Sequence, residues 1–472
     1  MARLLVNLLL AVSWIGCTLA PRDERPALPV PDRFPGGGGS LAAADQGWRT
    51  MFGDPRLQAL IGLALANNRD LRVAALNVEV ARAQYRIQRA GLFPTLDARA
   101  LWSRFGGSGP FAGPSTASSS SASTATSGSL FPPSIYALGG SASYELDLFG
   151  RVRSLTAAAR EQYLGTLEAQ RAAHLSLVGQ VVTQYLAERS LAEQYEIAVH
   201  TEATTRRTYE LTRQLFELGQ RSAVELRATE AQWQSARGEL PRLTRQWTQA
   251  SNALVVLVGQ PLPTNLPPPQ RLSVERMIAD LAPGLPSQVL LRRPDVVEAE
   301  HALRAANASI GAARAALFPD ISLTGFAGTL STAVKQLFDT GFGAISAILT
   351  QPVFHGGANL ANLDLADAQK RIQIARYEQT IQIAFREVAD ALVARETYER
   401  ELAAQAAQVT AQQERFDLTQ QRYRAGVASY LEVLTAQNDL YTAQQRLIVL
   451  RADRLTNLAD LYRALGGGWR EG

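Results

Sequence analysis

Apolar positions along this chain repeat with a helical period over two very long runs. Neither run contains proline; the first spans Arg151–Glu217 and the second Ala358–Ala425. At about 1.5 Å per residue, each run predicts a helix roughly 100 Å long, which exceeds the width of an ordinary globular core. In the second half of the chain the apolar seam advances in helical and heptad steps, which favours coiled-coil packing. The seam positions are Ile374, Tyr377, Ile381, Phe385, Val388, Leu392, Leu402, Val409, Phe416, Tyr423, Leu434, Tyr441, Ile448, Leu455 and Tyr462. An ordinary helical bundle would explain this seam equally well, but not the length of the helices.

A short glycine-containing break follows each long run, and a second helix follows each break. Glycine at 219 and at 426 permits the left-handed backbone conformation that ends many helices. Ser222 and Ser429 are suited to cap the next helix, and Glu225 and Glu432 lie in its first turn, where a negative charge complements the helix dipole. Each half of the chain is therefore expected to form a long helical hairpin. Helix capping could be the whole role of the two glutamates.

Four shorter segments instead alternate apolar and polar residues with the period of a strand. They lie at about 96–103, 138–148, 320–327 and 342–353, and their polar faces carry Asp97, Arg99, Glu145, Asp147 and Asp320. Strands of about ten residues with this alternation are typical of membrane β-strands. Four strands cannot close a barrel, and an open edge in a bilayer leaves backbone groups unsatisfied, so spanning strands would require several chains. The alternative is a soluble α+β protein with two exposed hairpins.

The two halves of the chain are an internal repeat. Asp70–Pro94 aligns without gaps on Asp295–Pro319, and Leu211–Trp233 aligns on Leu418–Leu440. We therefore expect a first structural repeat at 54–259 with a strand hairpin at about 94–149. A linker at 260–293 leads to a second repeat at 294–466 with a hairpin at about 319–354, and 467–472 form a C-terminal tail.

The N-terminus carries the features of a secreted lipoprotein. An apolar run too short to span a bilayer predicts a signal peptide over residues 1–16. Cys17 is the single cysteine and follows a glycine, as in a bacterial lipobox, although Trp14 replaces the usual leucine. The Pro- and Gly-rich residues 17–53 would then be a lipidated tether, and Thr18, where inner-membrane retention needs aspartate, points to the outer membrane. The alternative is a signal peptide that happens to contain a cysteine.

Composition excludes several other classes of protein. The 472 residues are 46% hydrophobic and 19% charged with a net charge of +4, which fits neither a disordered chain nor a nucleic-acid-binding protein. The four histidines, expected at the surface, have no partners at metal-ligand spacing. There is no phosphate-binding loop and no GxSxG or HExxH motif. We predict no enzyme activity, no metal and no cofactor.

Several stretches, taken in order, resemble the TolC-like outer-membrane factors, in particular the NodT-type lipoprotein subgroup of drug-efflux channels. The stretch LPSQVLLRRPDV is the most specific of them. The others are CTLAPRDERP, DPRLQALIGLALANNRDLRVA, RAGLFP, SYELDLFGRVRS, AALFPDISL, LTQPVFHGG and RYRAGVASYLEVLTAQNDL. Together they extend over the whole mature chain.

The resemblance implies a mainly α fold with a membrane β-barrel: a homotrimer in which three chains of four strands form a 12-stranded barrel in the outer membrane. The long helices would form a hollow tunnel across the periplasm, and the segments near 54–67 and 259–290 an equatorial belt. Asp97, Arg99, Glu145, Asp147 and Asp320 would face the barrel lumen.

The two turns would lie at the periplasmic tip, where the pore narrows and an adaptor protein docks. The tip and gate residues would be Gly219, Arg221, Ser222, Glu225, Arg422, Arg424, Gly426, Ser429 and Glu432. In a trimer Glu225 and Glu432 would make a ring of six carboxylates that favours cations or forms salt bridges with the arginines.

The resemblance thus implies a passive exit duct for drugs or other small amphiphilic compounds. Its partners would be outer-membrane lipid, a periplasmic adaptor of the membrane fusion protein class and an inner-membrane efflux pump. A duct for type I protein secretion and a non-conducting periplasmic coiled-coil scaffold are the alternatives.

Overall fold

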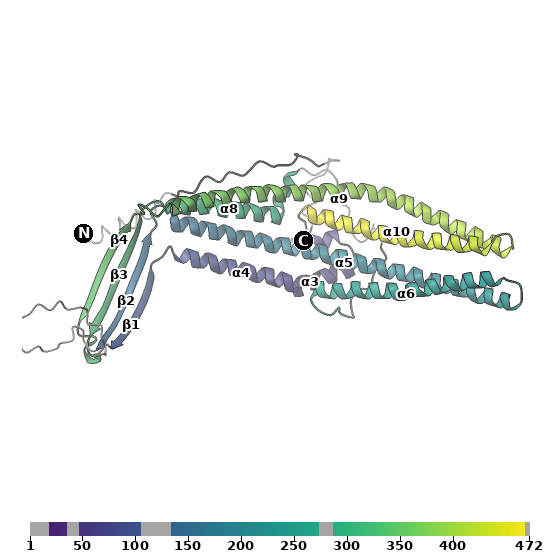
Figure 1. The fold of residues 1–472 in the computed structure, drawn as a ribbon, viewed down its shortest axis with the longest axis horizontal. Helices are drawn as coiled ribbons and strands as arrows, with labels where there is room; N and C mark the ends of the chain where they lie inside the picture. The colour runs from purple at the N-terminus through teal and green to yellow at the C-terminus, as the bar shows by residue number, and fades with distance from the viewer. Residues whose placement is uncertain (1–17, 35–46, 105–133, 273–286, 468–472) are drawn as a thin grey trace, which may run out of the picture. The chain divides into compact units, whose positions relative to one another are not determined.

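The chain folds as a mainly helical protein with one four-stranded sheet (Figure 1). The computed structural model describes residues 18–34, 47–104, 134–272 and 287–467. The predicted signal peptide, Cys17 and most of the C-terminal tail lie outside these residues. The chain divides into two compact units, which we describe separately: Met1–Glu24, Arg82–Gln162 and Arg304–Ile372 form the first, and Arg25–Ala81, Tyr163–Leu303 and Gln373–Gly472 the second.

The order of elements repeats, with nearly equal lengths in the two halves. Helices α4 (Arg69–Ala90) and α8 (Pro294–Ala315) each have 22 residues. Two strands follow each of them, and then the long helices α5 (Arg151–Glu217) and α9 (Ala358–Arg424), of 67 residues each. Helices α6 (Ala223–Val258) and α10 (Tyr430–Ala464) complete the halves with 36 and 35 residues. The predicted fold class, long helical hairpins with four strands per chain, is confirmed.

The sheet in the first unit is antiparallel throughout, in the order β1-β2-β3-β4. Its strands are β1 (Thr95–Arg104), β2 (Ser134–Leu146), β3 (Asp320–Ser331) and β4 (Gly341–Thr350). The register aligns Leu96 with Ala142, Ala142 with Gly325 and Gly325 with Ile345, so these four positions share one face. By alternation along the strands the one charged position on that face is Arg104, the last residue of β1, whereas Asp97, Arg99, Glu145 and Asp320 lie on the other face. β1 and β4 are edge strands within the chain.

The prediction that Asp147 lies on the second strand is wrong. β2 ends at Leu146, and the Asp147 carboxylate instead accepts hydrogen bonds from the backbone N–H and the guanidinium Nε of Arg153, at 2.8 and 3.2 Å. Arg153 lies in the first turn of α5, where backbone N–H groups have no partner inside the helix. Capping the long helix thus takes precedence over extending the strand. β4 is also shorter than predicted, because it ends before Pro352, which has no N–H to donate.

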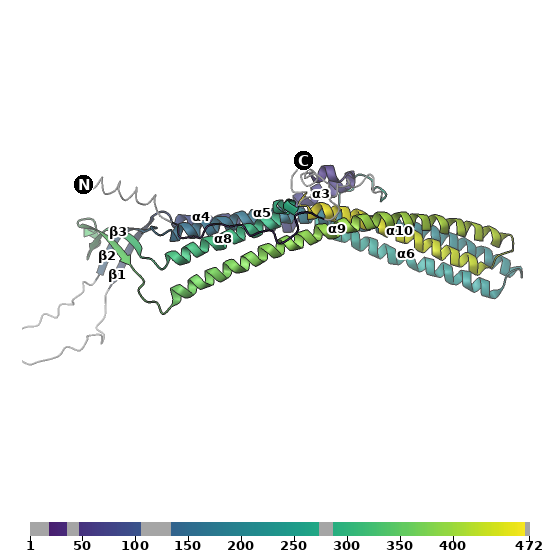
Figure 2. The same ribbon diagram turned by 90° about the horizontal axis from the view of Figure 1, so that it is seen from above.

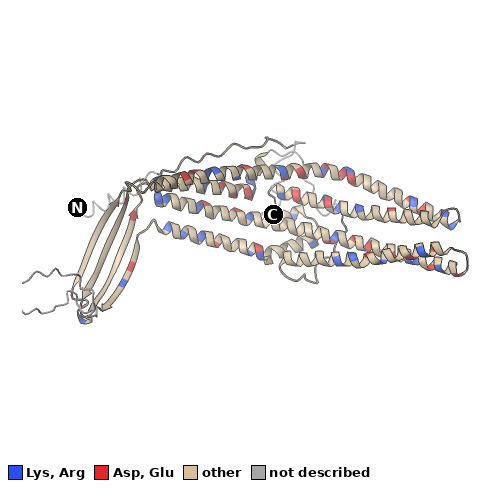
Figure 3. Ribbon diagram, in the orientation of Figure 1, with Lys and Arg blue, Asp and Glu red and all other residues tan. Residues whose placement is uncertain are grey.

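Charged residues of both signs are interspersed along the helices and are sparse on the strands (Figure 3). Within the described residues, no helix combines the length and apolar character needed to cross a membrane.

Paired helices form the second unit, as two views at right angles show (Figures 1 and 2). The antiparallel α5–α6 pair is held in register by a repeated aromatic contact. The rings of Tyr209 and Trp233 stack with centroids 5.2 Å apart, and the Trp233 indole donates to Glu202 at 2.8 Å. Two heptads further from the turn, the rings of Trp247 and Tyr195 lie 6.0 Å apart and are tilted by 35°, and the Trp247 indole donates to Glu188.

The main core of the second unit lies where α3 (Pro55–Asn67) and the short α2 (Trp48–Met51) pack on the long helices. Tyr185 of α5 is fully buried there and its hydroxyl donates to Asp54 at 2.7 Å. Asp54 also caps α3 by accepting from the backbone N–H groups of Arg56 and Leu57. A short 3-10 helix, Ser287–Arg292, contributes Val289 and Leu290 to the same core.

The predicted seam matches the buried positions in the core and departs from them near the α9–α10 turn. Tyr377, Ile381, Val388, Ile448, Leu455 and Tyr462 are all buried. Leu434 and Tyr441 are only half-buried, and their neighbours Val433 and Leu440 are buried in their place. The seam shifts by one residue because this end of α10 packs on α5 and α9 together rather than on α9 alone.

Candidate functional site

The two turns that join the long helices have the same backbone geometry. Gly219 and Gly426 have φ angles of +71° and +75°, in the left-handed region that favours glycine. After each glycine the next N–H returns to the last helical turn: Gln220 N donates to Leu215 O at 2.8 Å, and Val427 N to Arg422 O at 2.9 Å. This pattern closes the helix C-terminus and reverses the chain. The predicted roles of both glycines in ending a helix are confirmed.

Each turn then starts its second helix with a reciprocal cap. The Ser222 hydroxyl accepts from the Glu225 N–H at 3.2 Å, while the Glu225 carboxylate accepts from the Ser222 N–H at 3.4 Å. Ser429 and Glu432 repeat the arrangement at 3.4 and 3.0 Å. Both serine caps predicted from the sequence are therefore present. The glutamates are held at the helix starts by backbone groups, which fixes where their charges lie.

An arginine of the first turn reaches across to the second hairpin. The Arg221 guanidinium lies 4.7 Å from the centre of the Tyr423 ring and forms an ion pair with Glu225 at 3.3 Å. Tyr423 in turn meets Tyr430 edge-on, with ring centroids 5.8 Å apart. Both turns lie at the same end of the second unit (Figures 1 and 2). Sequence reasoning missed these tyrosines as site residues, because only the fold brings two distant turns together.

The second turn carries its own ion pair. Arg422 lies 3.7 Å from Glu432, and the pKa of the Glu432 carboxyl is below its usual value, chiefly because the Ser429 backbone N–H donates to it. Arg424, also predicted at the gate, donates instead to Gln420 at 3.1 Å. The structure therefore brings Arg221 and Arg422, but not Arg424, to the two acids.

A surface groove runs beside this turn between α9 and α10, with a volume of about 790 Å³. Leu418 and Leu431 line it and are largely exposed, at 61% and 68%. The charged side chains of Glu414, Arg415 and Arg422 complete its lining. An exposed apolar strip bordered by charges is typical of a protein-binding surface.

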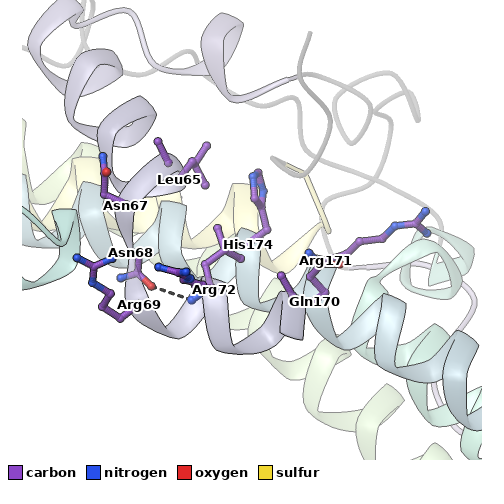
Figure 4. A pocket seen from close by; sticks show the side chains of 11 residues that line it. Leu65, Asn67, Asn68, Arg69, Arg72, Gln170, Arg171 and His174 are labelled. Carbon is purple, nitrogen blue, oxygen red and sulfur yellow. Dashed lines mark hydrogen bonds between the residues drawn. The ribbon is translucent and has the colours of Figure 1, made fainter. Parts of the chain in front are cut away.

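A second cavity, of about 600 Å³, lies at the break between α3 and α4 (Figure 4). Asn68 caps α4 here, since its side-chain oxygen accepts from the Leu71 N–H at 2.9 Å and its amide nitrogen donates to Leu257 O. Arg69, Arg72 and Arg171 give the lining a basic character. The sequence predicted no site at this position.

The polar face of the sheet has one well-defined ion pair. Arg151, at the start of α5, contacts both carboxylate oxygens of Glu145, at 2.9 and 2.5 Å. Among the described residues, Asp97, Arg99 and Asp320 make no side-chain hydrogen bond or ion pair. The predicted lumen residues on the strands thus share a face without forming one cluster.

In the part of the chain that the structure describes, no three histidine, cysteine or acidic residues come together as metal ligands. His200 and His355 are exposed, as predicted, whereas His174 and His301 are half-buried.

Comparison with known proteins identifies the family. Residues 60–260 and 285–467 match the family described as Outer membrane efflux protein. The antibiotic efflux pump outer membrane protein ArpC of Pseudomonas putida is 43% identical over 465 residues, which cover 97% of this chain and 93% of that protein. The cation efflux system protein CusC of Escherichia coli is 39% identical over 469 residues, 98% of each chain.

A solved structure agrees with these relatives. The open state of the Neisseria gonorrhoeae MtrE outer membrane channel matches with a TM-score of 0.85 and 40% identity, covering 96% of this chain and 99% of that one. The resemblance inferred from sequence motifs is confirmed at the level of the family. This chain belongs to the outer membrane efflux protein family.

Proposed function

We propose that three copies of this chain assemble into an exit duct of the outer membrane, in which twelve strands close a barrel and the long helices line a tunnel. The duct conducts small amphiphilic compounds passively, and the energy comes from an inner-membrane pump reached through a periplasmic adaptor. The observation that carries the proposal is the sheet. It has one face that is free of charge apart from Arg104 at the end of β1, and two edges that are unpaired within the chain.

The sheet cannot be stable in a bilayer as a single chain. Each open edge would leave N–H and C=O groups without partners, at several kcal/mol per group. Pairing β1 of one chain with β4 of the next removes both edges at once. The apolar face would then meet lipid, in keeping with the 90% exposure of Ile345 in the single chain. Asp97, Arg99 and Glu145 would face the water-filled lumen.

The two turns would form the gate at the periplasmic tip of the tunnel. Glu225 and Glu432 are fixed by their caps and would give a trimer six carboxylates around the pore. The Arg221–Tyr423 contact ties the two hairpins of a chain together and would favour the closed arrangement. The groove lined by Leu418 and Leu431 offers the adaptor an apolar surface beside the gate.

The anchor is the thiol of Cys17, acylated after removal of residues 1–16. Cys17 itself lies outside the described residues. The segment that follows it is held on the protein: the Asn307 side chain donates to Pro21 O at 2.8 Å, and Arg25 forms an ion pair with Glu300. An N-terminal segment fixed in this way supports a tether that starts at the membrane.

Amphiphilic compounds in general, rather than one substrate, are proposed as cargo. The relatives are named for efflux of antibiotics, toluene and cations, which have no common chemistry.

Ion conductance tests the proposal. Purified full-length protein, reconstituted in a planar lipid bilayer, should show stepwise conductance in KCl. Protein denatured before reconstitution is the control. Folded protein that inserts without any conductance would contradict the duct and favour the periplasmic scaffold.

A further inference from the structure

A separate cavity of about 350 Å³ lies between α5, α9 and α10, away from the two turns. Ile197 and Thr201 of α5 form one wall, Phe416 of α9 another, and Leu440 and Tyr441 of α10 the third. The volume is within the range of small-molecule sites, which run from about 300 to 1,000 Å³. The walls come from both helical hairpins of one chain.

One lining residue is not satisfied by the protein. The Gln437 side chain is 8% exposed and makes no hydrogen bond with any residue that the structure describes. The amide atoms of Gln437 are not among the side-chain atoms that are sealed from solvent without a partner, so a ligand or water in the cavity can reach them. Gln437 also occupies the position that Glu230 holds in the first repeat, where the carboxylate is instead paired with Arg227 on the surface. The first repeat therefore has no equivalent amide at this position.

The other polar groups that line the cavity are hydroxyls and amides, together with the imidazole of His200, which is exposed. No aspartate, glutamate, lysine or arginine is among them. The Tyr441 hydroxyl is buried without a hydrogen bond of good geometry, although Gln445 lies near enough to influence it. Burial raises the pKa of Tyr441 to about 12, so this hydroxyl stays protonated and neutral. A charged ligand would find no counterion here and would lose its hydration.

We propose that this cavity binds a small neutral aromatic molecule that carries one amide-type group. The Gln437 amide would supply both a donor and an acceptor to the polar group of the ligand, and the rings of Phe416 and Tyr441 would contact its aromatic part. The site lies between the two helical hairpins and is distinct from the residues of the two turns. It does not depend on the channel function proposed above.

The probe for this site is 4-fluorobenzamide, which has a neutral ring and a primary amide. Fluorine NMR line broadening would be measured with full-length protein in lipid nanodiscs, against empty nanodiscs to correct for partition into lipid. Two variants remove the site in different ways: Gln437→Leu deletes the amide at similar volume, and Thr201→Phe fills the cavity. Gln408→Leu is the matched control, because Gln408 is exposed on α9 and does not line the cavity.

We expect saturable binding to the wild type and to Gln408→Leu, at least tenfold weaker binding to Gln437→Leu, and none to Thr201→Phe. Gln437→Leu should melt close to the wild type, because Gln437 makes no hydrogen bond with any residue that the structure describes. Equal binding by all four proteins, or no saturable binding by the wild type, would overturn the proposal. If Gln437→Leu fails to fold, the test is the difference in probe binding between Thr201→Phe and the wild type.

Discussion

The guanidinium of Arg221, in the turn between α5 and α6, lies 4.7 Å from the ring centre of Tyr423, near the end of α9. This contact joins two turns that are about two hundred residues apart in the sequence and belong to different structural repeats. Arg221 is also paired with Glu225, so one side chain links a charge at a helix start to an aromatic ring on the other hairpin. A gate that opens by separating the two hairpins has to break the contact between Arg221 and Tyr423.

Arg221→Ala should make the isolated channel leak. A partly exposed cation–π contact contributes about 0.5–1 kcal/mol, whereas the ion pair with Glu225 lies within one hairpin and persists when the hairpins separate. The loss of about 0.5–1 kcal/mol per chain corresponds to a rise of roughly 2–5-fold in the open-to-closed ratio for each chain of the trimer. The open-to-closed ratio would be measured as the single-channel open probability in planar bilayers. Arg227→Ala is the control, since Arg227 has only the exposed ion pair with Glu230. Equal open probability in both variants would remove Arg221 from the gate.

Replacing Glu225 and Glu432 together by glutamine should lower cation selectivity without unfolding the turns. Glutamine can make the same reciprocal cap as glutamate, so the helix starts should persist while the carboxylate charges are lost. The reversal potential under a KCl gradient should move toward zero. An unchanged reversal potential would mean that the two glutamates serve only as caps.

A lysine in the middle of the apolar face of the sheet should impair assembly far more than a lysine on the other face. Ile345 and Ser346 are adjacent in β4 and point to opposite faces. Ile345→Lys would place a charge toward lipid, at a cost of about 2–4 kcal/mol near the middle of the bilayer, whereas Ser346→Lys would face water. The two variants would be compared by the yield of folded protein in outer membranes. Similar yields would argue against a lipid-facing sheet.

The first turn of α10 should loosen in acid. The pKa of Glu432 is lowered in the folded state, first by the Ser429 backbone N–H and then by the Ser429 hydroxyl. The stabilisation from its charged form is therefore complete above the usual glutamate pKa of about 4.3 and is lost as the pH falls through the lower folded value. Hydrogen exchange at Tyr430–Val433, corrected for intrinsic rates, should accelerate over that range. The Glu432→Gln variant has no carboxylate there to titrate and should show no such step. A step of the same size in both proteins would assign the effect to another group.

Much of the fold could be predicted from the sequence, because each element depends on local patterns. The run from Arg151 to Glu217 lacks proline and forms one helix with those same bounds. The caps by Ser222 and Ser429 follow from residues three apart in the chain. Asp147 was misplaced because two local rules competed there, strand alternation and the capping of α5, and the sequence alone does not rank them.

Contacts between distant segments could not be predicted in this way. The meeting of Arg221 with Tyr423 depends on how the two hairpins pack, and both residues look like ordinary members of their own helices or turns. The same holds for Gln437, whose isolation from partners depends on α5 and α9 packing around it. Its sequence neighbours give no sign that a cavity lies beside it.

The mass of the native assembly tests the central claim most directly. Full-length protein would be extracted from outer membranes in mild detergent and its mass measured by native mass spectrometry. We predict three copies of the mature chain, each bearing lipid on Cys17. A monomer extracted without lipid would leave the edges of β1 and β4 unpaired and would contradict the barrel, the anchor and the duct together.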